Sequence, residues 1–285
     1  MKNWSNQSVT WGRIESRWQG LKTLCWISDL HLDQASEFSR WSFLSQLSMS
    51  EAEGFVLTGD IAHSGQLEMR LHELAQAVAP RPMFFVLGNH DYYFSSIPKI
   101  TKIVASVCAS ERNLVHLGNG EILLLGRSSA LIGHQGWADG RSGWGDRTFV
   151  KSPDHKWIDD FRTIPKSDRF AAMARMSDES AAYCRRLLPY CLRRFEKVLA
   201  ATHVPPFLQA AIHAGSPCGP THQPHFCNLA LGRALWNLTV GFPGRLKVLC
   251  GHTHSGARIE FSGIEVHAAQ AVLGCPEIQA VFSLN

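Results

Sequence analysis

The chain has 285 residues, a formal net charge of +4 at pH 7, 45% hydrophobic residues and 18% charged residues. This composition excludes a disordered chain, and one domain of this length can bury a sizeable core. The positive charge is small and is not concentrated in a basic patch, so nucleic acid is not the expected partner.

Three features predict a protein of the cytoplasm. The longest apolar runs are too short to cross a bilayer, and the first twenty residues lack the apolar core of a secretion signal. None of the eight cysteines belongs to a Cys-x-x-Cys pair, and several lie in apolar runs. We therefore expect buried free thiols in a reducing compartment and no membrane partner.

Short apolar runs and amphipathic stretches alternate over the first hundred residues. They predict strands at 21–27, 54–57 and 83–87, and helices at 37–49, 66–78 and from Pro98 onward. Strands of this length separated by helices are typical of β-α-β units and a parallel sheet. Further short strands near 114, 122–125 and 130–132, without long helices between them, predict a more antiparallel continuation.

The pattern lapses between 133 and about 177, where turn residues surround Trp137, Trp144 and Trp157. A long connection rich in aromatic residues is typical of a binding loop, so we predict a cap-like insertion at about 133–177. A helix is then expected at 177–199, with strands at 198–203, 246–249, 257–261, 264–267 and 280–284. Residues 1–20 are expected to form an extension ahead of a single domain at 21–285.

Five of the predicted strands end in residues that can bind metals. These residues are Asp29, His31, Asp60, Asn89, His203, His252 and His254. Parallel strands present their carboxyl ends at one edge of a sheet, so we expect these side chains to meet. Carboxylate, amide and imidazole donors in this number suit two divalent metals that share one carboxylate. Gly59, Gly88 and Gly251 precede three of the ligands and are expected to permit tight turns there.

The ordered blocks resemble the signature of the calcineurin-like metallophosphoesterase superfamily. They read Asp29-Leu30-His31, Gly59-Asp60, Gly88-Asn89-His90-Asp91, His203 and Gly251-His252-Thr253-His254. The resemblance implies an α/β fold, namely a four-layer α/β/β/α sandwich of two mixed β-sheets flanked by helices. It further implies one metal bound by Asp29, His31, Asp60 and His254, and another bound by Asp60, Asn89, His203 and His252.

The resemblance also implies the activity of a metallophosphoesterase, a hydrolase that depends on a dinuclear metal centre. Two divalent ions, Mn in the first place and Fe, Zn, Co or Ni as alternatives, would bind the phosphoryl oxygens. They would lower the pKa of a bridging water, so that a metal-bridging hydroxide attacks phosphorus in line. His90 is placed to act as a catalytic residue that protonates the leaving oxygen, with Asp91 adjacent to orient or charge it.

The substrate is left open among small phosphate esters. The role of His90 favours a phosphodiester over a monoester, which makes a phosphatase the first alternative. A nuclease would need a groove lined with Lys and Arg, and a non-catalytic scaffold would be expected to lack some of the seven ligands. Four more histidines lie near the expected substrate entrance, where a structural or solvent-exposed role is favoured: His134, His213, His222 and His225.

Overall fold

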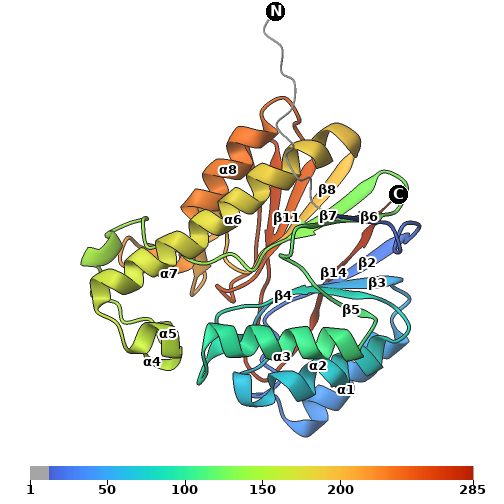
Figure 1. Cartoon of the computed structure of the whole chain (residues 1–285), viewed down its shortest axis with the longest axis horizontal. Helices are drawn as coiled ribbons and strands as arrows, with labels where there is room; N and C mark the ends of the chain where they lie inside the picture. The colour runs from blue at the N-terminus through green and yellow to red at the C-terminus, as the bar shows by residue number, and fades with distance from the viewer. Residues whose placement is uncertain (1–12, 285) are drawn as a thin grey trace, which may run out of the picture.

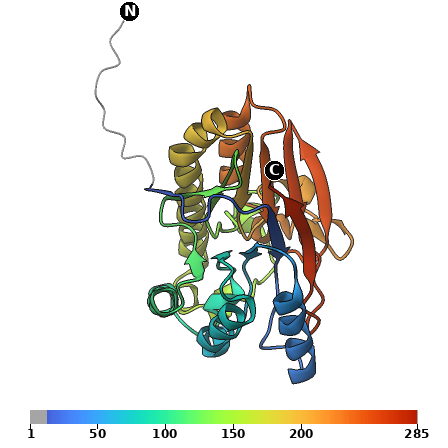
Figure 2. The same ribbon diagram turned by 90° about the vertical axis from the view of Figure 1, so that its right-hand side faces the viewer.

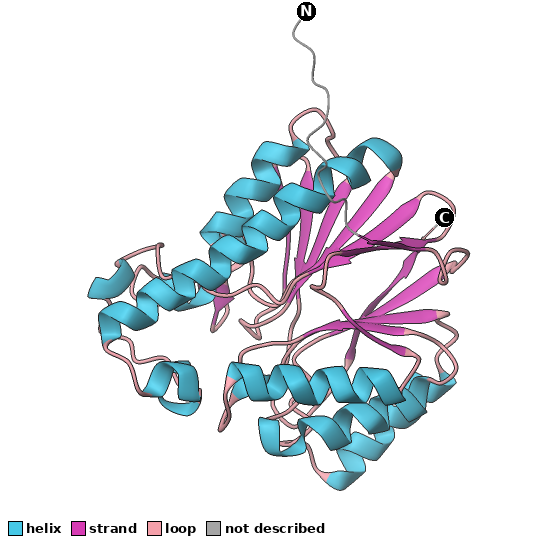
Figure 3. Cartoon of the chain, in the orientation of Figure 1, coloured by secondary structure: helices cyan, strands magenta, loops and turns pink. Residues whose placement is uncertain are grey.

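The structure, a computed structural model, describes residues 13–284. Two mixed β-sheets pack face to face, and helices cover both outer faces (Figures 1 and 3). Two views at right angles place helices α1–α3 (Glu37–Met49, Ser64–Val78 and Ile97–Ser110) and the long helix α6 (Lys166–Arg194) on opposite sides of the sheets (Figures 1 and 2). The predicted four-layer α/β/β/α sandwich is confirmed.

The five-stranded sheet has the order β14-β2-β3-β4-β5 and is covered by α1–α3. Its strands are β2 (Thr23–Ile27), β3 (Gly54–Thr58), β4 (Met83–Val86), β5 (Leu114–His116) and β14 (Ile278–Ser283). Strands β2 to β4 are parallel, as the alternation of strands and helices predicts. Strand β5 is also parallel, so the expected antiparallel continuation is wrong for it, and β14 closes the sheet in the antiparallel direction.

The seven-stranded sheet has the order β1-β6-β7-β8-β11-β13-β12 and is covered by α6 and α8 (Leu229–Thr239). Its strands are β1 (Arg13–Glu15), β6 (Glu121–Leu125), β7 (Ser129–Gly133), β8 (Lys197–Ala201), β11 (Leu246–Cys250), β12 (Ala257–Phe261) and β13 (Ile264–Ala268). Pairs β6–β7 and β12–β13 are antiparallel, whereas β7, β8, β11 and β13 are parallel. The expected antiparallel continuation is therefore confined to parts of this sheet.

The central strands are apolar throughout because both of their faces are buried. Side chains alternate along a strand, so Phe55 and Leu57 of β3 pack with the helices while Val56 packs between the sheets. In the other sheet, Val198 of β8 packs towards the helices and Leu199 packs between the sheets. This arrangement brings the carboxyl ends of the parallel strands of both sheets to one edge.

Helix α6 begins earlier than the sequence predicts, at Lys166 rather than 177, and ends at Arg194 rather than 199. Its first turns bury Phe170, Met173 and Ser177, whose spacing of three and four residues fits one helical face. Because charged residues surround them, the sequence does not show this apolar face clearly. The predicted insertion at 133–177 therefore contains the start of α6.

The rest of the insertion holds three short elements, η2 (Gly145–Arg147), α4 (Asp154–Trp157) and α5 (Asp159–Arg162). With the start of α6 they form a lobe that projects beside the two sheets (Figure 1). We call residues 141–170 the cap lobe. A small hairpin of β9 (Ile212–His213) and β10 (Ser216–Pro217), the short helix α7 (Gln223–Phe226) and a 3-10 turn η3 (Leu208–Ala210) follow β8.

Residues 1–12 of the predicted extension lie outside the described part of the chain, and residues 13–15 form β1, which pairs with β6. All eight cysteines are free, and six are buried, but Cys108 is half-buried and Cys275 is exposed. The expectation of buried thiols is wrong for Cys275 because it lies in a turn that an isolated bridge to Val272 closes. Over residues 13–284, no helix has both the length and the apolarity that a membrane span needs.

Candidate metal centre

The seven predicted metal ligands meet at the common edge of the two sheets. Asp29 and His31 follow β2, Asp60 follows β3, Asn89 follows β4, His203 follows β8, and His252 and His254 follow β11. Backbone hydrogen bonds hold the loops together, from the Asp29 amide to the Gly59 carbonyl (3.0 Å) and from the Gly251 amide to the His203 carbonyl (2.8 Å). Ligands from both sheets therefore share one site.

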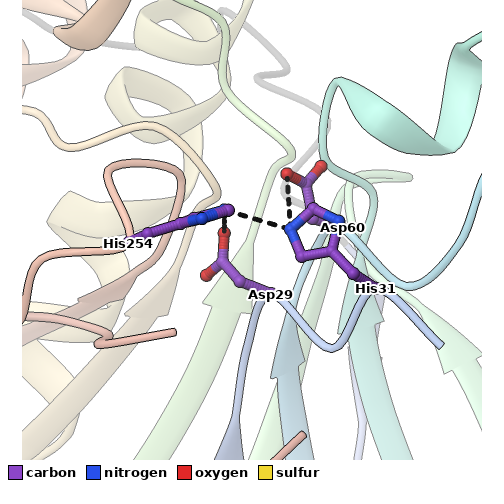
Figure 4. Close-up of side chains that lie close together, drawn as sticks. All are labelled: Asp29, His31, Asp60 and His254. Atoms are coloured by element: carbon purple, nitrogen blue, oxygen red, sulfur yellow. Dashed lines mark hydrogen bonds and ion pairs between the residues drawn. The ribbon is translucent and has the colours of Figure 1, made fainter. Parts of the chain in front are cut away.

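One group consists of Asp29, His31, Asp60 and His254, whose ligand atoms all lie within 4.8 Å of one another (Figure 4). Nε2 of His31 lies 3.0 Å from Nε2 of His254 and 3.7 Å from Oδ2 of Asp60. Nε2 of His254 lies 3.5 Å from Oδ1 of Asp29. Two carboxylates and two imidazoles converge here, a donor set that suits divalent transition metals.

A second group forms around Asn89. Its Oδ1 lies 3.1 Å from Nε2 of His203 and 2.9 Å from Nδ1 of His252. The same Nε2 of His203 lies 3.4 Å from Oδ1 of Asp60. Asp60 thus turns Oδ2 towards the first group and Oδ1 towards the second, which is the position of a shared ligand.

Five of the seven residues have a backbone that side chains other than glycine rarely adopt. The φ angles are 50° at Asp29, 40° at His31, 53° at Asp60, 76° at His252 and 57° at His254. Non-glycine residues with positive φ are strained and persist where the surrounding structure enforces them, often at functional sites. The strained positions coincide with predicted ligands, which supports a metal site on grounds independent of the donor chemistry.

The glycines beside the ligands serve two purposes. Gly59 has a φ of 93° and makes the turn that the sequence predicts. Gly88 and Gly251 do not have positive φ, so the prediction of a glycine-type turn is wrong for them. A Cβ atom on Gly88 would overlap Oδ1 of Asp60, and one on Gly251 would overlap Oδ2 of Asp29. These two glycines are needed because the carboxylates approach the backbone closely.

Burial keeps two of the imidazoles neutral, and neighbouring charges keep Asp60 ionised. Burial lowers the pKa of His31 and of His252 to about 4. Burial also acts on His203, but the carboxylates of Asp60 and Asp29 outweigh it and raise the pKa of His203 to about 10. Burial would raise the pKa of Asp60, yet attraction to His203 and His90 holds it well below its usual value. A metal cation at this position would replace the proton on His203.

Hydrogen bonds fix which nitrogen of each imidazole faces the site. Nδ1 of His203 donates to the Thr58 carbonyl (2.8 Å), and Nε2 of His252 donates to the His225 carbonyl (2.8 Å). Because a carbonyl only accepts, Nε2 of His203 and Nδ1 of His252 are the nitrogens that face the site, and each can bind a metal when it carries no proton. Such outer partners orient metal-binding histidines in many proteins.

The cap lobe fixes the orientation of Asn89. Its Nδ2 donates to Oδ1 of Asp154 (2.8 Å) and to the hydroxyl of Tyr93 (3.2 Å), which in turn donates to Asp154 (2.7 Å). The amide nitrogen is thereby occupied, so Oδ1 of Asn89 faces His203 and His252. The sequence analysis missed Asp154 and Tyr93, because nothing in the sequence shows that the cap lobe folds back onto Asn89.

Replacing Asp154 with Leu is expected to lower metal affinity or activity about 10–100-fold, the usual effect of losing such an outer partner. The Asn89 amide would lose the acceptor that orients it. Metal titration and hydrolysis assays measure the effect, with Asp159→Asn as the control, since Asp159 lies in the same lobe in an exposed ion pair with Arg162. Unchanged metal affinity in Asp154→Leu would contradict this role.

The two remaining residues of the third motif have different environments. Nε2 of His90 lies 3.9 Å from Oδ2 of Asp60, its ring centroid is 4.7 Å from that of His31, and its side chain lines a cavity beside the metal ligands. Among the described residues, Nδ1 of His90 has no hydrogen-bond partner. The imidazole is thus close to the ligands, and although Nδ1 is buried, the exposed 23% of the side chain contributes to the cavity wall.

The carboxylate of Asp91 is fully buried and accepts hydrogen bonds from backbone amides of both neighbouring loops. The donors are the amides of Gly88 (2.8 Å), Asp60 (3.1 Å), Ile61 (2.8 Å) and Ala62 (3.0 Å). His90 is not among these partners. Asp91 therefore does not orient the imidazole of His90, as the sequence predicts, but positions the Asp60 loop. Burial, together with the charge of Asp60, raises the pKa of Asp91 to about 7.

Asp91→Ala is expected to destabilise the fold by about 3 kcal/mol or more, because four buried amides lose their acceptor. Thermal unfolding measured by circular dichroism tests this result. A residue that acted only on the imidazole of His90 would leave the melting temperature unchanged, which would contradict the structural role.

The cavity beside the ligands has a volume of about 500 Å³. His213, His222 and His225 line it, although the sequence analysis favoured structural or solvent-exposed roles for them. His134 does not line it and packs against Tyr183, with ring centroids 5.4 Å apart. Three of the four uncertain histidines are therefore placed on the wall of this cavity.

The fold brings a group of Asp and His residues that can hold metal ions to the meeting edge of two sheets. The family model for calcineurin-like phosphoesterases matches residues 22–256, and the chain belongs to this family. It is accordingly a hydrolase of phosphoester bonds, with a metal-binding group of Asp and His residues.

One solved structure shows the same fold at low sequence identity, and a second is less similar. The phosphopantetheinyl hydrolase PptH from Mycobacterium tuberculosis matches with a TM-score of 0.60 and 14% identity over 88% of this chain and 90% of that chain. TT1561 of Thermus thermophilus matches with a TM-score of 0.48 and 13% identity over 89% and 91% of the two chains. No curated protein matches the sequence.

Proposed function

We propose that the protein hydrolyses a small phosphodiester with two divalent metal ions that share Asp60. The position of Asp60 carries this proposal, since Oδ2 lies 3.7 Å from His31 and Oδ1 lies 3.4 Å from His203. The first ion would be held by Asp29, His31, Asp60 and His254, and the second by Asp60, Asn89, His203 and His252. Bound ions of this kind neutralise phosphoryl charge and activate water.

Manganese is the proposed metal, with Fe, Zn, Co and Ni as alternatives. Both groups combine hard oxygen donors with imidazole nitrogen and contain no thiolate, a set that all of these ions accept. The free thiols are compatible with our proposal that the protein works in the reducing cytoplasm.

His90 is the proposed general acid, which protonates the leaving group of the diester. A departing alkoxide is a strong base, so a proton delivered to it lowers the barrier, typically by a factor of 10²–10⁴. Nε2 of His90 lies 3.9 Å from Asp60, and the side chain faces the cavity in which the ester would be bound. Tyr93 supports the imidazole, with ring centroids 4.3 Å apart.

The cavity favours a small substrate over a nucleic acid strand. Its volume of about 500 Å³ is in the range of small-molecule sites, and Lys151 is the one Lys or Arg among the described residues that line it. A nuclease would track the phosphate backbone with several such side chains. A phosphomonoesterase remains the second candidate because the same donor groups would bind a monoester.

The test compares 4-nitrophenyl phosphate with bis(4-nitrophenyl) phosphate, after metal removal and reloading with Mn²⁺. We expect kcat/KM for the diester to exceed that for the monoester by roughly tenfold or more, a difference of about 1.4 kcal/mol. A preference for the monoester would favour the phosphatase. Absence of metal-dependent turnover of both would contradict the proposed function.

A further inference from the structure

A second cavity of about 600 Å³ lies in the cap lobe. It is lined by residues 148–153, by α4 and by the first turn of α6. Four of its residues, Val150 to Pro153, also line the cavity beside the metal ligands. A molecule bound at the metal site therefore has the second cavity as its direct neighbour across this short segment.

The second cavity carries positive charge without a balancing carboxylate. Lys151, Lys156, Lys166 and Arg169 line it, and no Asp or Glu is among its described lining residues. The ion pairs found between residues 13 and 284 include none of these four cations. A cavity lined by charges of one sign concentrates the field and attracts an oppositely charged ligand.

Three carboxylates of the cap lobe are bound elsewhere. Asp154 accepts from Asn89 and Tyr93 at the metal site. Asp159 pairs with Arg162 (2.9 Å), and Asp160 accepts from the Ile97 amide (2.7 Å). Asp168, which lies between Lys166 and Arg169 in the sequence, accepts from the hydroxyl of Ser167 (3.3 Å) and is not among the residues that line the cavity. The described lining thus contains the three lysines and the arginine but no carboxylate.

Two of the cations are held in place by contacts that do not neutralise them. Nζ of Lys166 donates to the Thr148 carbonyl (2.7 Å) and lies 5.8 Å from the ring centroid of Phe170. Nε of Arg169 donates to the carbonyls of Phe161 (2.8 Å) and Ile164 (3.0 Å). A guanidinium fixed in this way can bind a phosphate with little further loss of conformational freedom.

The apolar side chains that line the second cavity indicate which kind of chemical group carries the bound anion. Phe149 is 72% exposed, and it lines the cavity together with Val150, Pro153 and Trp157. A large exposed aromatic side chain beside a cationic cavity suits a ligand with a phosphate attached to a flat or apolar group.

We propose that this basic cavity of the cap lobe binds a second phosphate group of the substrate, so that the natural substrate is a small phosphodiester bearing a further phosphate. The inference rests on the proposed phosphodiesterase activity. It assigns Lys156, Lys166 and Arg169 to substrate selection, with Lys151 lying between the two cavities.

The experiment uses two substrates that differ only in the second phosphate. They are thymidine 5′-(4-nitrophenyl phosphate) and the same compound with a 3′-phosphate, assayed with the Mn²⁺-loaded full chain. We expect kcat/KM to be roughly tenfold higher or more for the 3′-phosphorylated compound, since charge-assisted hydrogen bonds are the strong ones. The ratio should fall towards one in Lys156→Gln/Lys166→Gln, which removes two positive charges from the lining of the cavity.

The matched control is Lys99→Gln/Lys102→Gln, which removes two exposed charges from α3 outside both cavities. The control is expected to keep the wild-type ratio. A ratio near one in the wild type would overturn the inference, and so would a high ratio that the cap-lobe variant leaves unchanged.

A binding measurement separates this inference from the proposed activity. If neither compound is hydrolysed, the proposed function fails, and calorimetric titration with thymidine 3′,5′-bisphosphate and thymidine 5′-phosphate still tests the cavity. Tighter binding of the bisphosphate that is lost in Lys156→Gln/Lys166→Gln supports the inference, and equal binding overturns it. Affinity for single-stranded oligonucleotides that rises with their length would show a nucleic-acid strand as the occupant and overturn the small-molecule assignment.

Discussion

Asp60→Asn is expected to reduce metal-dependent phosphoester hydrolysis by roughly 10³-fold or more. A metal ion stabilises transition-state charge by several kcal/mol, and Asp60 is placed to hold both ions. The amide of Asn keeps the shape of the side chain but loses the charge and one acceptor oxygen. Steady-state kinetics with bis(4-nitrophenyl) phosphate measure the loss.

The control for this substitution is again Asp159→Asn, an exposed carboxylate of the cap lobe. Circular dichroism spectra that match the wild type would exclude misfolding as the cause. Activity of Asp60→Asn within tenfold of the wild type would contradict the shared-ligand role, because one oxygen alone would then suffice.

His90→Gln is expected to lower kcat by a factor of about 10²–10⁴, while metal content stays at the wild-type level. The imidazole lies near the ligands but belongs to neither group of donors, so its loss removes proton delivery and not metal binding. The loss should be smaller for a 4-nitrophenyl ester than for an alkyl ester, because 4-nitrophenolate departs without needing a proton. Kinetics with both esters, and metal analysis of the purified variant, measure these effects.

Two outcomes would contradict the assignment of His90. Loss of bound metal in His90→Gln would show that His90 is a metal ligand. An equal decrease in kcat for the 4-nitrophenyl and alkyl esters would show that His90 does not protonate the leaving group. His134 offers a matched control, since it is a half-buried histidine that packs against Tyr183 and does not line the cavity beside the metal ligands.

The sequence predicts the parallel strands and the seven candidate ligands for the same physical reason, whereas the four layers are implied by the resemblance to the family. A strand that is buried on both faces has a continuous apolar sequence. The polar residue that follows each such run can therefore be recognised from the sequence. Asp60 after Val56 and Leu57 is recognisable in this way, and so is His252 after Val248 and Leu249. The parallel direction of the strands then predicts the edge at which the ligands meet.

The rest of the site depends on contacts between distant segments, which periodicity cannot show. Asp154 reaches Asn89 across 65 positions of the chain, and it lies in a stretch that reads as turn residues. The motif predicts that Asp91 orients or charges the adjacent His90. In the structure, the Asp91 carboxylate instead accepts hydrogen bonds from backbone amides of the Asp60 loop. The start of α6 was missed because its buried face is only Phe170, Met173 and Ser177 among charged residues.

The most direct test of the central claim is the number of metal ions bound per chain, in the wild type and in Asp60→Asn. Both proteins are stripped, reloaded with Mn²⁺, freed of excess metal and analysed by inductively coupled plasma mass spectrometry. We expect two ions per wild-type chain and one or fewer per Asp60→Asn chain. One ion in the wild type, or two in both proteins, would contradict a dinuclear centre that depends on Asp60.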